Sequence, residues 1–335
     1  MSKNTSLEEK LARKREAWVE RTGLALGLDE AAVIALLSQE RRQSLRLNPL
    51  IARPDETLIQ LKDIGWQGKP YEWIANGYTI DAGAIEVRDS ALVASGAVFM
   101  QNAASWLPVL ALDPRPGERI LDVCAAPGGK SSHIAAVTNN QVRLWVNDNS
   151  RGRLLRMQAN LKRLGVTPED MTLFDAMQLS RKLDGQRFDK ILLDAPCSGE
   201  GIMRYDRAKD FATWSVAHVK RLQQLQKRIL TQAWQLLEPG GILVYSTCTM
   251  APEENEAVVD YLLRTHDDAT IEPFTADLPN RVPTVREWNG RPYSDAVQDC
   301  LRLAPSGNIE AFFVCKLQKG DEDAVTIRRS GGSMV

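Results

Sequence analysis

Apolar and polar residues form segments that predict, from about residue 90 onward, strands and helices in regular succession. Short apolar runs bounded by turn residues indicate buried strands at residues 119–126, 142–148, 171–176, 189–196, 241–248 and 311–317. The segments between them predict a helix that begins at the Gly128-Gly129 pair and further helices at 150–166, 215–237 and 252–265. Strands that alternate with helices favour an α/β fold with a Rossmann-like, doubly wound, mostly parallel sheet.

The first 90 residues follow a different pattern, which predicts a small N-terminal α+β unit. Residues 7–42 carry apolar positions among many charges and favour helix. A strand is expected at 44–48 and a helix from Pro54, and the Asn-Gly pair within 71–80 favours a hairpin. We therefore expect an N-terminal unit over 1–90, a Rossmann-like domain over 91–318 and a flexible tail over 319–335.

Composition narrows the functional classes. A net charge of −1 and 44% hydrophobic residues are usual for a soluble globular protein. The N-terminus is polar and no apolar run is long enough to span a bilayer, so we expect a cytoplasmic protein without membrane attachment. The five cysteines form no CxxC pair and there are three histidines, which argues against disulfides and against a metal site. No feature suggests an oligomer, and a monomer is expected.

The first predicted strand runs into a loop suited to a ligand, made of Cys124, Ala125, Ala126, Pro127, Gly128, Gly129 and Lys130. Its two glycines allow close backbone approach, and the helix that follows favours negative charge. A nucleoside triphosphate site would need glycine where Cys124 stands, and a dinucleotide site would need Gly-x-Gly-x-x-Gly. S-adenosylmethionine needs neither pattern and is the favoured ligand. An ATP-binding enzyme is the less favoured alternative, because Gly129-Lys130-Ser131 fits that pattern in part.

Carboxylates follow the ends of the next three strands. Asp148 stands twenty residues after Gly128, where an acid that binds ribose hydroxyls is expected. Asp175 is placed to accept from an adenine amino group, and Asp194 ends the fourth strand. Any one of them alone suits a helix cap or a solvated loop. Four strand ends that carry Cys124 and three aspartates favour a cofactor site, because ligands of such sheets bind at this edge.

Two further cysteines lie at strand ends. Cys197 follows the fourth strand in Asp194-Ala-Pro-Cys197, and Cys248 follows the fifth strand in Ser-Thr-Cys-Thr. In the usual order of an adenosylmethionine-binding sheet these strands are neighbours, about 4.8 Å apart, so both thiols are expected at one substrate atom. Most free cysteines are buried small hydrophobes, which suits Cys300 and Cys315. The residues around Cys248 are polar and suit that interpretation less well.

Two thiols beside a methyl donor suit one reaction. Carbon 5 of a pyrimidine is too weak a nucleophile to take a methyl group unaided, but a thiolate added at carbon 6 turns the ring into an enamine that does so. Asp194 is placed to act as the acid near ring nitrogen 3, and the second thiol to assist release of the product. The spacing of the two cysteines leaves open which one is the nucleophile.

Three motifs together resemble a known family. The stretches "LDVCAAPGGK" at 121–130, "DAPCSGEG" at 194–201 and "STCTMAPEENE" at 246–256 closely resemble the Sun (Fmu-like) family of RNA cytosine-5 methyltransferases. The resemblance covers about residues 90–318. A departure occurs in the last strand, where Glu310-Ala311 precedes the aromatic pair in place of the family's usual glycine.

The resemblance implies a cofactor and a role for each residue. The loop 124–130 with Asp148, Asp175 and Asp194 would bind S-adenosylmethionine. Cys248 would be the nucleophile, and Cys197 would help to release the product. The segment 44–80 resembles the family's small RNA-binding unit, so RNA is expected to bind to the core and to residues 1–90.

Basic residues follow the Asp-Ala-Pro-Cys loop. Residues 200–230 hold seven basic and three acidic side chains. Arg204 and Arg207 come directly after the loop and are the expected contacts to RNA phosphates. The basic stretch 151–163 suits a solvated helix face. A catalytically silent RNA-binding or assembly protein is the alternative of another class, and the pattern does not decide between ribosomal and transfer RNA.

Overall fold

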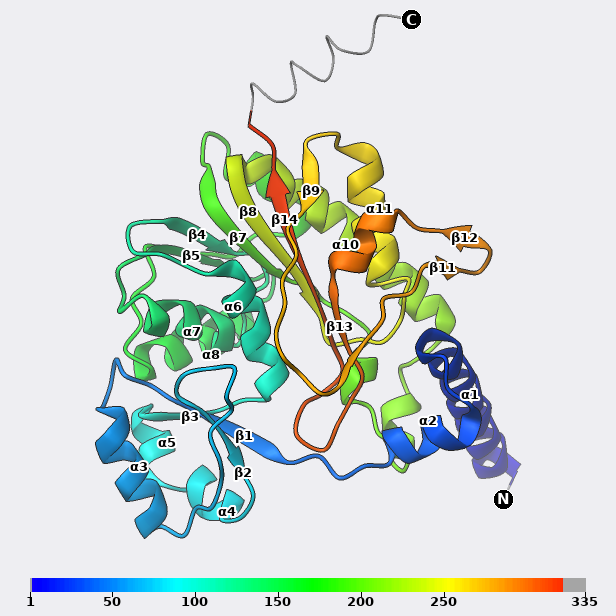
Figure 1. Ribbon diagram of the computed structural model, residues 1–335, viewed down its shortest axis with the longest axis horizontal. Coiled ribbons are helices and arrows are strands. Elements are labelled where there is room, and N and C mark those ends of the chain that lie inside the picture. Colours follow the sequence, from blue (N-terminus) through cyan, green and yellow to red (C-terminus); the bar gives the residue numbers. More distant parts are fainter. Residues whose placement is uncertain (1, 322–335) are drawn as a thin grey trace, which may run out of the picture.

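A computed structural model of the chain describes residues 2–321 (Figure 1). Its centre is a sheet in which five strands run parallel, namely β4 (Arg119–Asp122), β5 (Arg143–Asn147), β6 (Asp170–Thr172), β7 (Phe188–Asp194) and β8 (Leu237–Thr247). Four antiparallel strands extend it, namely β9 (Ala269–Ile271), β10 (Arg281–Val282), β13 (Leu301–Leu303) and β14 (Phe312–Lys319). The order is β10-β13-β14-β8-β7-β4-β5-β6, with β9 beside β14. The predicted Rossmann-like α/β fold is confirmed.

Helices cover both faces of this sheet (Figure 1). One face carries α6 (Leu107–Leu112), α7 (Gly129–Val137) and α8 (Arg151–Arg163), and the other carries α9 (Leu179–Lys182), α10 (Val216–Leu236) and α11 (Glu256–Thr265). Successive residues of a strand point to opposite faces. Along β7, Ile191 and Leu193 pack in the core with α10, and Leu192 packs in the core with α6 and α7. Burial on both faces explains the near-continuous apolar runs of the parallel strands.

A second, three-stranded sheet lies at the N-terminal side. It consists of β1 (Gln43–Leu47), β2 (Gly77–Ile80) and β3 (Val98–Met100) in the order β2-β1-β3, with α3 (Pro54–Asp63), α4 (Ala84–Arg88) and α5 (Ala91–Ser95). The sheet takes its third strand from beyond residue 90, where the sequence places the domain boundary. β3 then leads through the short helix η1 (Ala103–Trp106) directly into α6.

The hairpin predicted within 71–80 is wrong. Only β2 forms there, and its strand partner is β1. The preceding residues form no strand and meet this segment at the single bridges between Pro70 and Tyr78 and between Gln67 and Ala82 and at the hydrogen bond from the Tyr71 amide to the Gly77 carbonyl. Asn76 has a left-handed backbone (φ 63°), so the Asn-Gly pair does make a turn. The residues before it do not form a strand, because Tyr71 and Trp73 turn their rings onto Trp106, with centroid distances of 5.6 and 6.0 Å.

The helical segment predicted at 7–42 is two helices, α1 (Ser2–Leu26) and α2 (Glu30–Leu37). Gly27 ends the first in a left-handed conformation (φ 68°), and Asp29 caps the second by accepting from the Ala32 amide. Figure 1 shows both helices across the molecule from the three-stranded sheet. They pack against the segment 203–214 that follows Cys197, mainly through Trp18 and Phe211.

The start of α11 also differs from the prediction, which placed it at Pro252. The helix begins at Glu256 because Glu253, Glu254 and Asn255 are buried and make contacts elsewhere, and Asn255 is far from helical geometry (φ −109°, ψ −97°). The predicted strand 171–176 is shorter than expected and ends at Thr172.

The remaining elements are short. They are the hairpin strands β11 (Glu287–Trp288) and β12 (Arg291–Pro292) and the 3-10 helices η2 (Ala176–Gln178), η3 (Glu200–Ile202), η4 (Ala208–Phe211) and η5 (Asp295–Asp299). β14 extends to Lys319, one residue into the predicted tail, and 322–335 lie outside the described residues. No helix within 2–321 has both the length and the apolar character needed to cross a bilayer.

Candidate active site

Two thiols meet at the carboxyl ends of the neighbouring strands β7 and β8. Asp194 of β7 lies opposite Ser246 of β8 in the parallel register, so the loops that carry Cys197 and Cys248 leave the sheet side by side. The two sulfur atoms lie 3.2 Å apart, and both cysteines are free and half-buried. The sulfur contact with Cys248, together with burial, raises the pKa of the Cys197 thiol well above its usual range. Cys197 therefore keeps its proton at neutral pH.

Asp194 lies at the same edge and is held in place from two sides. Lys130 donates from Nζ to its Oδ2 at 2.6 Å, and the Ser246 hydroxyl donates to its Oδ1 at 2.9 Å. Burial lowers the pKa of Lys130, but the charge of Asp194 outweighs this and raises it on balance. The pair therefore presents an ammonium and a carboxylate beside the thiols.

A cavity of about 250 Å³ lies against the glycine loop. Its lining includes Asp122, Asp194 and Lys130, the loop residues Cys124–Pro127 and Gly129, and the segment Phe99–Gln101 that leaves the N-terminal sheet. A Cβ at Gly129 would come within 2.9 Å of the Gln101 amide nitrogen and 3.2 Å of the Phe99 ring, so the end of the Gln101 side chain would have to shift. Gly128 has a left-handed backbone (φ 98°) and begins α7. The left-handed backbone favours glycine at Gly128, and the absence of a side chain at Gly129 lets Gln101 and Phe99 lie close to the loop.

Asp122 is a lining residue that the sequence analysis did not select. It is buried, its Oδ2 accepts from the Ser131 hydroxyl at 2.6 Å, and its Oδ1 has no hydrogen-bond partner among the described residues. Burial raises the pKa of this carboxyl group to about 7. An unpartnered buried oxygen in a cavity wall fits a ligand that carries hydrogen-bond donors. Its position at the end of the first parallel strand, just before Cys124, was the available signal.

The other predicted cofactor residues lie at the same edge but do not line this cavity. Asp148, directly after β5, is buried, accepts from the Ser150 amide at 2.9 Å and lies 3.2 Å from Arg153. Asp175 is half-buried and caps η2 by accepting from the Met177 amide. Cys124, by contrast, does line the cavity, and burial raises the pKa of its thiol above the usual range.

The two arginines selected for RNA follow the thiol loop, and each has an acidic neighbour. Arg204 pairs with Asp206 at 2.8 Å, and Arg207 lies 3.8 Å from Asp210. Sequence reasoning missed Arg41, which reaches from the N-terminal segment and donates to the carbonyl oxygens of Gly201 and Met203 at 2.6 and 2.9 Å. No residue near it in the sequence signals this contact.

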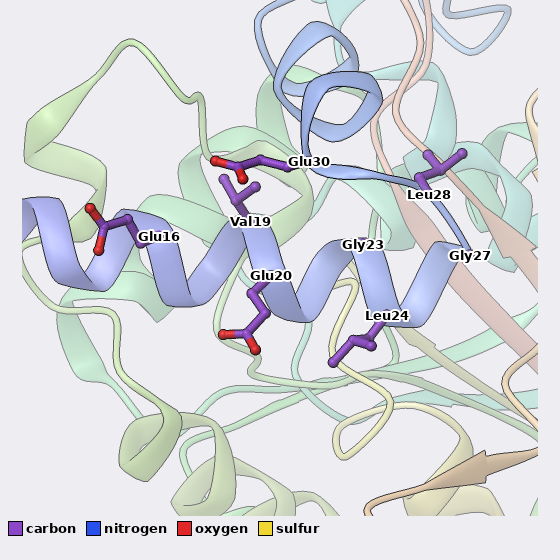
Figure 2. Close-up of a pocket in the computed structure, with 8 residues that line it drawn as sticks. All are labelled: Glu16, Val19, Glu20, Gly23, Leu24, Gly27, Leu28 and Glu30. Atoms are coloured by element: carbon purple, nitrogen blue, oxygen red, sulfur yellow. The ribbon is translucent and has the colours of Figure 1, made fainter.

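A larger cavity of about 770 Å³ lies away from this chemistry (Figure 2). It is lined by α1 and the start of α2, and its residues include Glu16, Glu20, Leu24 and Glu30. It contains no thiol and no residue of the glycine loop. Within 2–321, no group of three or more His, Cys, Asp or Glu side chains is arranged to hold a metal ion.

Comparison with known proteins identifies the family to which the chain belongs. Residues 109–318 match the model of a family described as 16S rRNA methyltransferase RsmB/F. The chain belongs to this family. The resemblance of its three motifs to Sun (Fmu-like) methyltransferases is thereby confirmed, and the matched residues include both thiols and the glycine loop.

Curated relatives include two kinds of RNA methyltransferase. The chain is 38% identical over 287 residues to a tRNA (cytosine(49)-C(5))-methyltransferase of Pyrococcus abyssi, and the match covers 85% of this chain and 90% of that protein. It is 37% identical over 292 residues to ribosomal RNA small subunit methyltransferase F of Serratia proteamaculans, covering 85% of this chain and 59% of that protein. The chain thus spans less than two thirds of the length of that ribosomal enzyme.

Solved structures support the fold. A methyltransferase homologue from Pyrococcus horikoshii superposes with a TM-score of 0.79 at 31% identity, covering 94% of this chain and 99% of the other. NSun6 of the same organism, solved with SFG, superposes with a TM-score of 0.77 at 22% identity, covering 91% and 98%.

Proposed function

We propose that the chain transfers a methyl group from S-adenosylmethionine to carbon 5 of a cytosine in RNA, through a covalent adduct between Cys248 and carbon 6. The observation that carries the proposal is the 3.2 Å contact between the sulfurs of Cys197 and Cys248, next to a cavity walled by the glycine loop. Transfer of a methyl group to a more nucleophilic amino group requires no thiol at this position. The relative from Pyrococcus abyssi, named as a cytosine-C(5) methyltransferase, supports the same chemistry.

The residues at the glycine loop fit the proposed cofactor. S-adenosylmethionine supplies an electrophilic methyl group when bound. The loop 124–130 would hold it by close backbone approach, and the unpartnered Oδ1 of Asp122, in the ionised form of the carboxyl group, would accept a hydrogen bond from a donor of the cofactor. Asp148 would bind the ribose hydroxyls and Asp175 the adenine amino group, at the strand ends where such groups bind in these sheets.

The two thiols, Asp194 and Lys130 each have a separate role in the reaction of the pyrimidine. The Cys248 sulfur forms a bond to carbon 6, which makes carbon 5 nucleophilic. Negative charge develops near ring nitrogen 3 as the adduct forms, and Asp194 delivers a proton there, which it takes from the Lys130 ammonium through their 2.6 Å hydrogen bond. After methyl transfer a water molecule takes the proton from carbon 5, the electron pair of that bond forms the double bond between carbons 5 and 6, and the Cys248 thiolate is expelled. Cys197 assists this release by giving its proton to the departing sulfur, which lies 3.2 Å away. A protonated Cys197 suits that late role better than it suits nucleophilic attack, because the thiolate is the reactive form.

The RNA would be held by the core and by the N-terminal residues, including Arg204 and Arg207. Transfer RNA and ribosomal RNA are both acted on by named relatives. The high coverage of the Pyrococcus abyssi protein favours a transfer RNA as the first substrate to test.

The two cysteines give the proposal a sharp test. Cys248→Ala should abolish methylation and form no covalent link to RNA, because the nucleophile is gone. Cys197→Ala should form the adduct in the presence of S-adenosylmethionine but resolve it slowly, so that a protein–RNA species accumulates on denaturing gels. Cys300→Ala is the matched control, because this thiol is buried away from the pair. Accumulation in the Cys248 variant would reverse the roles, and full activity in both variants would refute the mechanism.

A further inference from the structure

The loops that carry Cys197 and Cys248 are also connected by four other side chains, those of Ser198, Glu200, Thr249 and Glu254. Ser198 and Thr249 directly follow Cys197 and Cys248 in the sequence. Their hydroxyl oxygens lie 2.8 Å apart, so one hydrogen bond joins the loop after β7 to the loop after β8. Any change in this contact moves the sulfur atoms relative to each other, because each hydroxyl belongs to the residue next to a thiol.

Two buried carboxyl groups hold this bridge. Glu254 accepts from the Ser198 amide at 2.9 Å and from Gln226 at 2.8 Å, and its other oxygen lies 3.2 Å from the Thr249 hydroxyl. Glu200 accepts from the Trp214 ring nitrogen at 2.8 Å and lies 3.3 Å from the same hydroxyl. Glu254 is 0% and Glu200 is 3% exposed. Thr249 therefore lies between two carboxyl groups that water does not reach.

Neither carboxyl group has a cationic partner among the residues of 2–321. Their neighbours do: Glu253 pairs with Arg21 at 2.7 Å, and Glu256 pairs with Arg302 at 2.9 Å. A buried carboxylate without a counter-charge is costly, and protonation removes the cost. Glu253 and Glu256, which flank Glu254 in the sequence, therefore each form an ion pair with an arginine, and Glu254 does not.

Hydrogen-bond counting at Thr249 leads to the same conclusion. The hydroxyl has one proton to donate and two lone pairs, and one lone pair already accepts from the Ala251 amide at 3.2 Å. It cannot donate to both carboxylates and also serve Ser198. If the second lone pair accepts from Ser198 and the proton goes to one carboxylate, the other carboxylate faces the hydroxyl oxygen with no hydrogen between them, and a proton on that carboxyl group removes the repulsion. Burial raises the pKa of Glu254 to about 7 and raises that of Glu200 as well.

We propose that Glu254 and Glu200 are positioning residues that share a proton and lock the two thiol loops together through Thr249 and Ser198. This inference rests on the proposed function, because the thiols are the groups it aligns. Loss of the shared proton leaves two like charges facing one hydroxyl, which pushes the loops apart and separates the thiols. The charged and titratable groups facing Glu254 are Glu200 from η3, Cys197 after β7 and Tyr245 from β8. Glu200 in turn faces Glu253 and Arg21, which form an ion pair with each other.

The test compares the pH dependence of Glu254→Gln and wild type. Glutamine keeps the shape and stays neutral, so the ratio of its kcat to that of wild type should rise severalfold from about pH 6 to about pH 8. Glu287→Gln is the control, and its ratio should stay flat, because Glu287 is exposed on β11 and has no contact with Glu254 or Glu200. A purely structural role would also give a flat ratio for Glu254→Gln and would overturn the proposal.

Thr249 provides an independent pair of variants. Thr249→Val keeps the shape but removes the hydroxyl, and it should lower kcat about tenfold or more with little change in the KM for RNA, because misplaced groups slow the chemical step. Thr249→Ser should restore the rate. Equal rates for the valine and serine variants would refute the bridge. If wild type transfers no methyl group, the proposed function fails; if wild type is active and the Glu254→Gln ratio is flat, only this inference fails.

Discussion

At the scale of single residues, the polar groups at the carboxyl edge of the sheet are of two kinds. Some have all their hydrogen-bond partners within the protein, and others lack a partner. Asp194 has both oxygens occupied, by Lys130 and Ser246. Asp122 has one oxygen free of partners although it is buried. A buried acceptor without a donor is costly, so it marks the position at which a ligand supplies one.

Asp148→Ala should weaken the binding of S-adenosylmethionine while the protein stays folded. The carboxylate is buried directly after β5, where a ribose-binding acid belongs. A hydrogen bond to a charged group contributes about 1.5–3 kcal/mol, which corresponds to about 10-fold to 150-fold in Kd. Isothermal titration calorimetry measures this, and thermal melting checks the fold. An unchanged Kd would remove Asp148 from the site.

Arg204→Ala combined with Arg207→Ala should weaken RNA binding and flatten its dependence on salt. Each phosphate contact contributes to the slope of log K against log salt concentration, so two lost contacts lower the slope. Arg156→Ala is the matched control, since Arg156 is exposed on α8 in the stretch expected to be solvated. Equal slopes for wild type and the double variant would show that the contacts to Asp206 and Asp210 are their only role.

At the scale of elements, the N-terminal helices support the thiol loop from outside the Rossmann-like domain. Trp18 of α1 is fully buried and meets the Phe211 ring of η4 at 5.2 Å, and Met203 and Trp214 join the same core. This packing fixes the segment that continues from Cys197 through Gly201. The backbone of Gly201 donates in turn to the Cys248 carbonyl at 2.9 Å. The helices therefore act on both thiol loops through one segment.

Trp18→Ala should destabilise the protein and slow methylation together. Truncation of a buried tryptophan to alanine lowers the free energy of unfolding by about 3–5 kcal/mol, because burial of the ring is lost and a cavity is left behind. Urea unfolding measures the cost, and kcat at low temperature reports on the loosened segment. Leu24→Ala, on the exposed side of the same helix at 69% exposure, should leave both unchanged. A stable Trp18 variant with normal kcat would contradict the proposed support.

At the scale of the whole molecule, the motifs could be recognised in the sequence, but the contacts between distant segments could not be predicted from it. The strand ends with Asp194, Cys197 and Cys248 could be predicted, because period and turn residues locate strands and the sheet order places their ends together. The start of α11 could not be predicted. Glu254 accepts a hydrogen bond from the Ser198 amide and lies outside the helix, although the local sequence favours helix there. Local propensity does not encode such a tertiary partner.

The cofactor cavity shows the same limit. One wall comes from Phe99–Gln101, which leaves the three-stranded sheet, and the others come from the Rossmann-like domain. A boundary at residue 90, drawn from a change in pattern, divides the chain close to a segment that the cavity needs. β3 and the residue that follows it therefore connect the two sheets at the site and contribute to the shape of the cavity.

Buried acids at this site also give the whole molecule a characteristic response to pH. Burial raises the pKa of Asp122 from 3.8 to about 7, so this group keeps its proton in the folded state after the unfolded chain has lost it. Its contribution to stability is therefore largest below about pH 4 and is lost as pH rises to about 7. His133 acts in the opposite direction, because burial lowers its pKa well below the usual value and the unfolded chain takes up its proton first. The two effects partly cancel, so the pH profile of wild type alone does not isolate Asp122.

The difference between Asp122→Asn and wild type does isolate it. Asparagine cannot ionise, so the free energy of unfolding of the variant should rise relative to wild type between about pH 4 and pH 7, by up to about 1.4 kcal/mol per pH unit, and then level off. Urea unfolding at several pH values measures this, with Asp63→Asn on the exposed end of α3 as the control for removal of a carboxylate. The variant should also bind S-adenosylmethionine less well, because Oδ1 is the oxygen left free for a donor in the cavity. A pH-independent difference would mean that Asp122 is ionised in the folded protein, and unchanged cofactor affinity would show that its free oxygen faces no ligand.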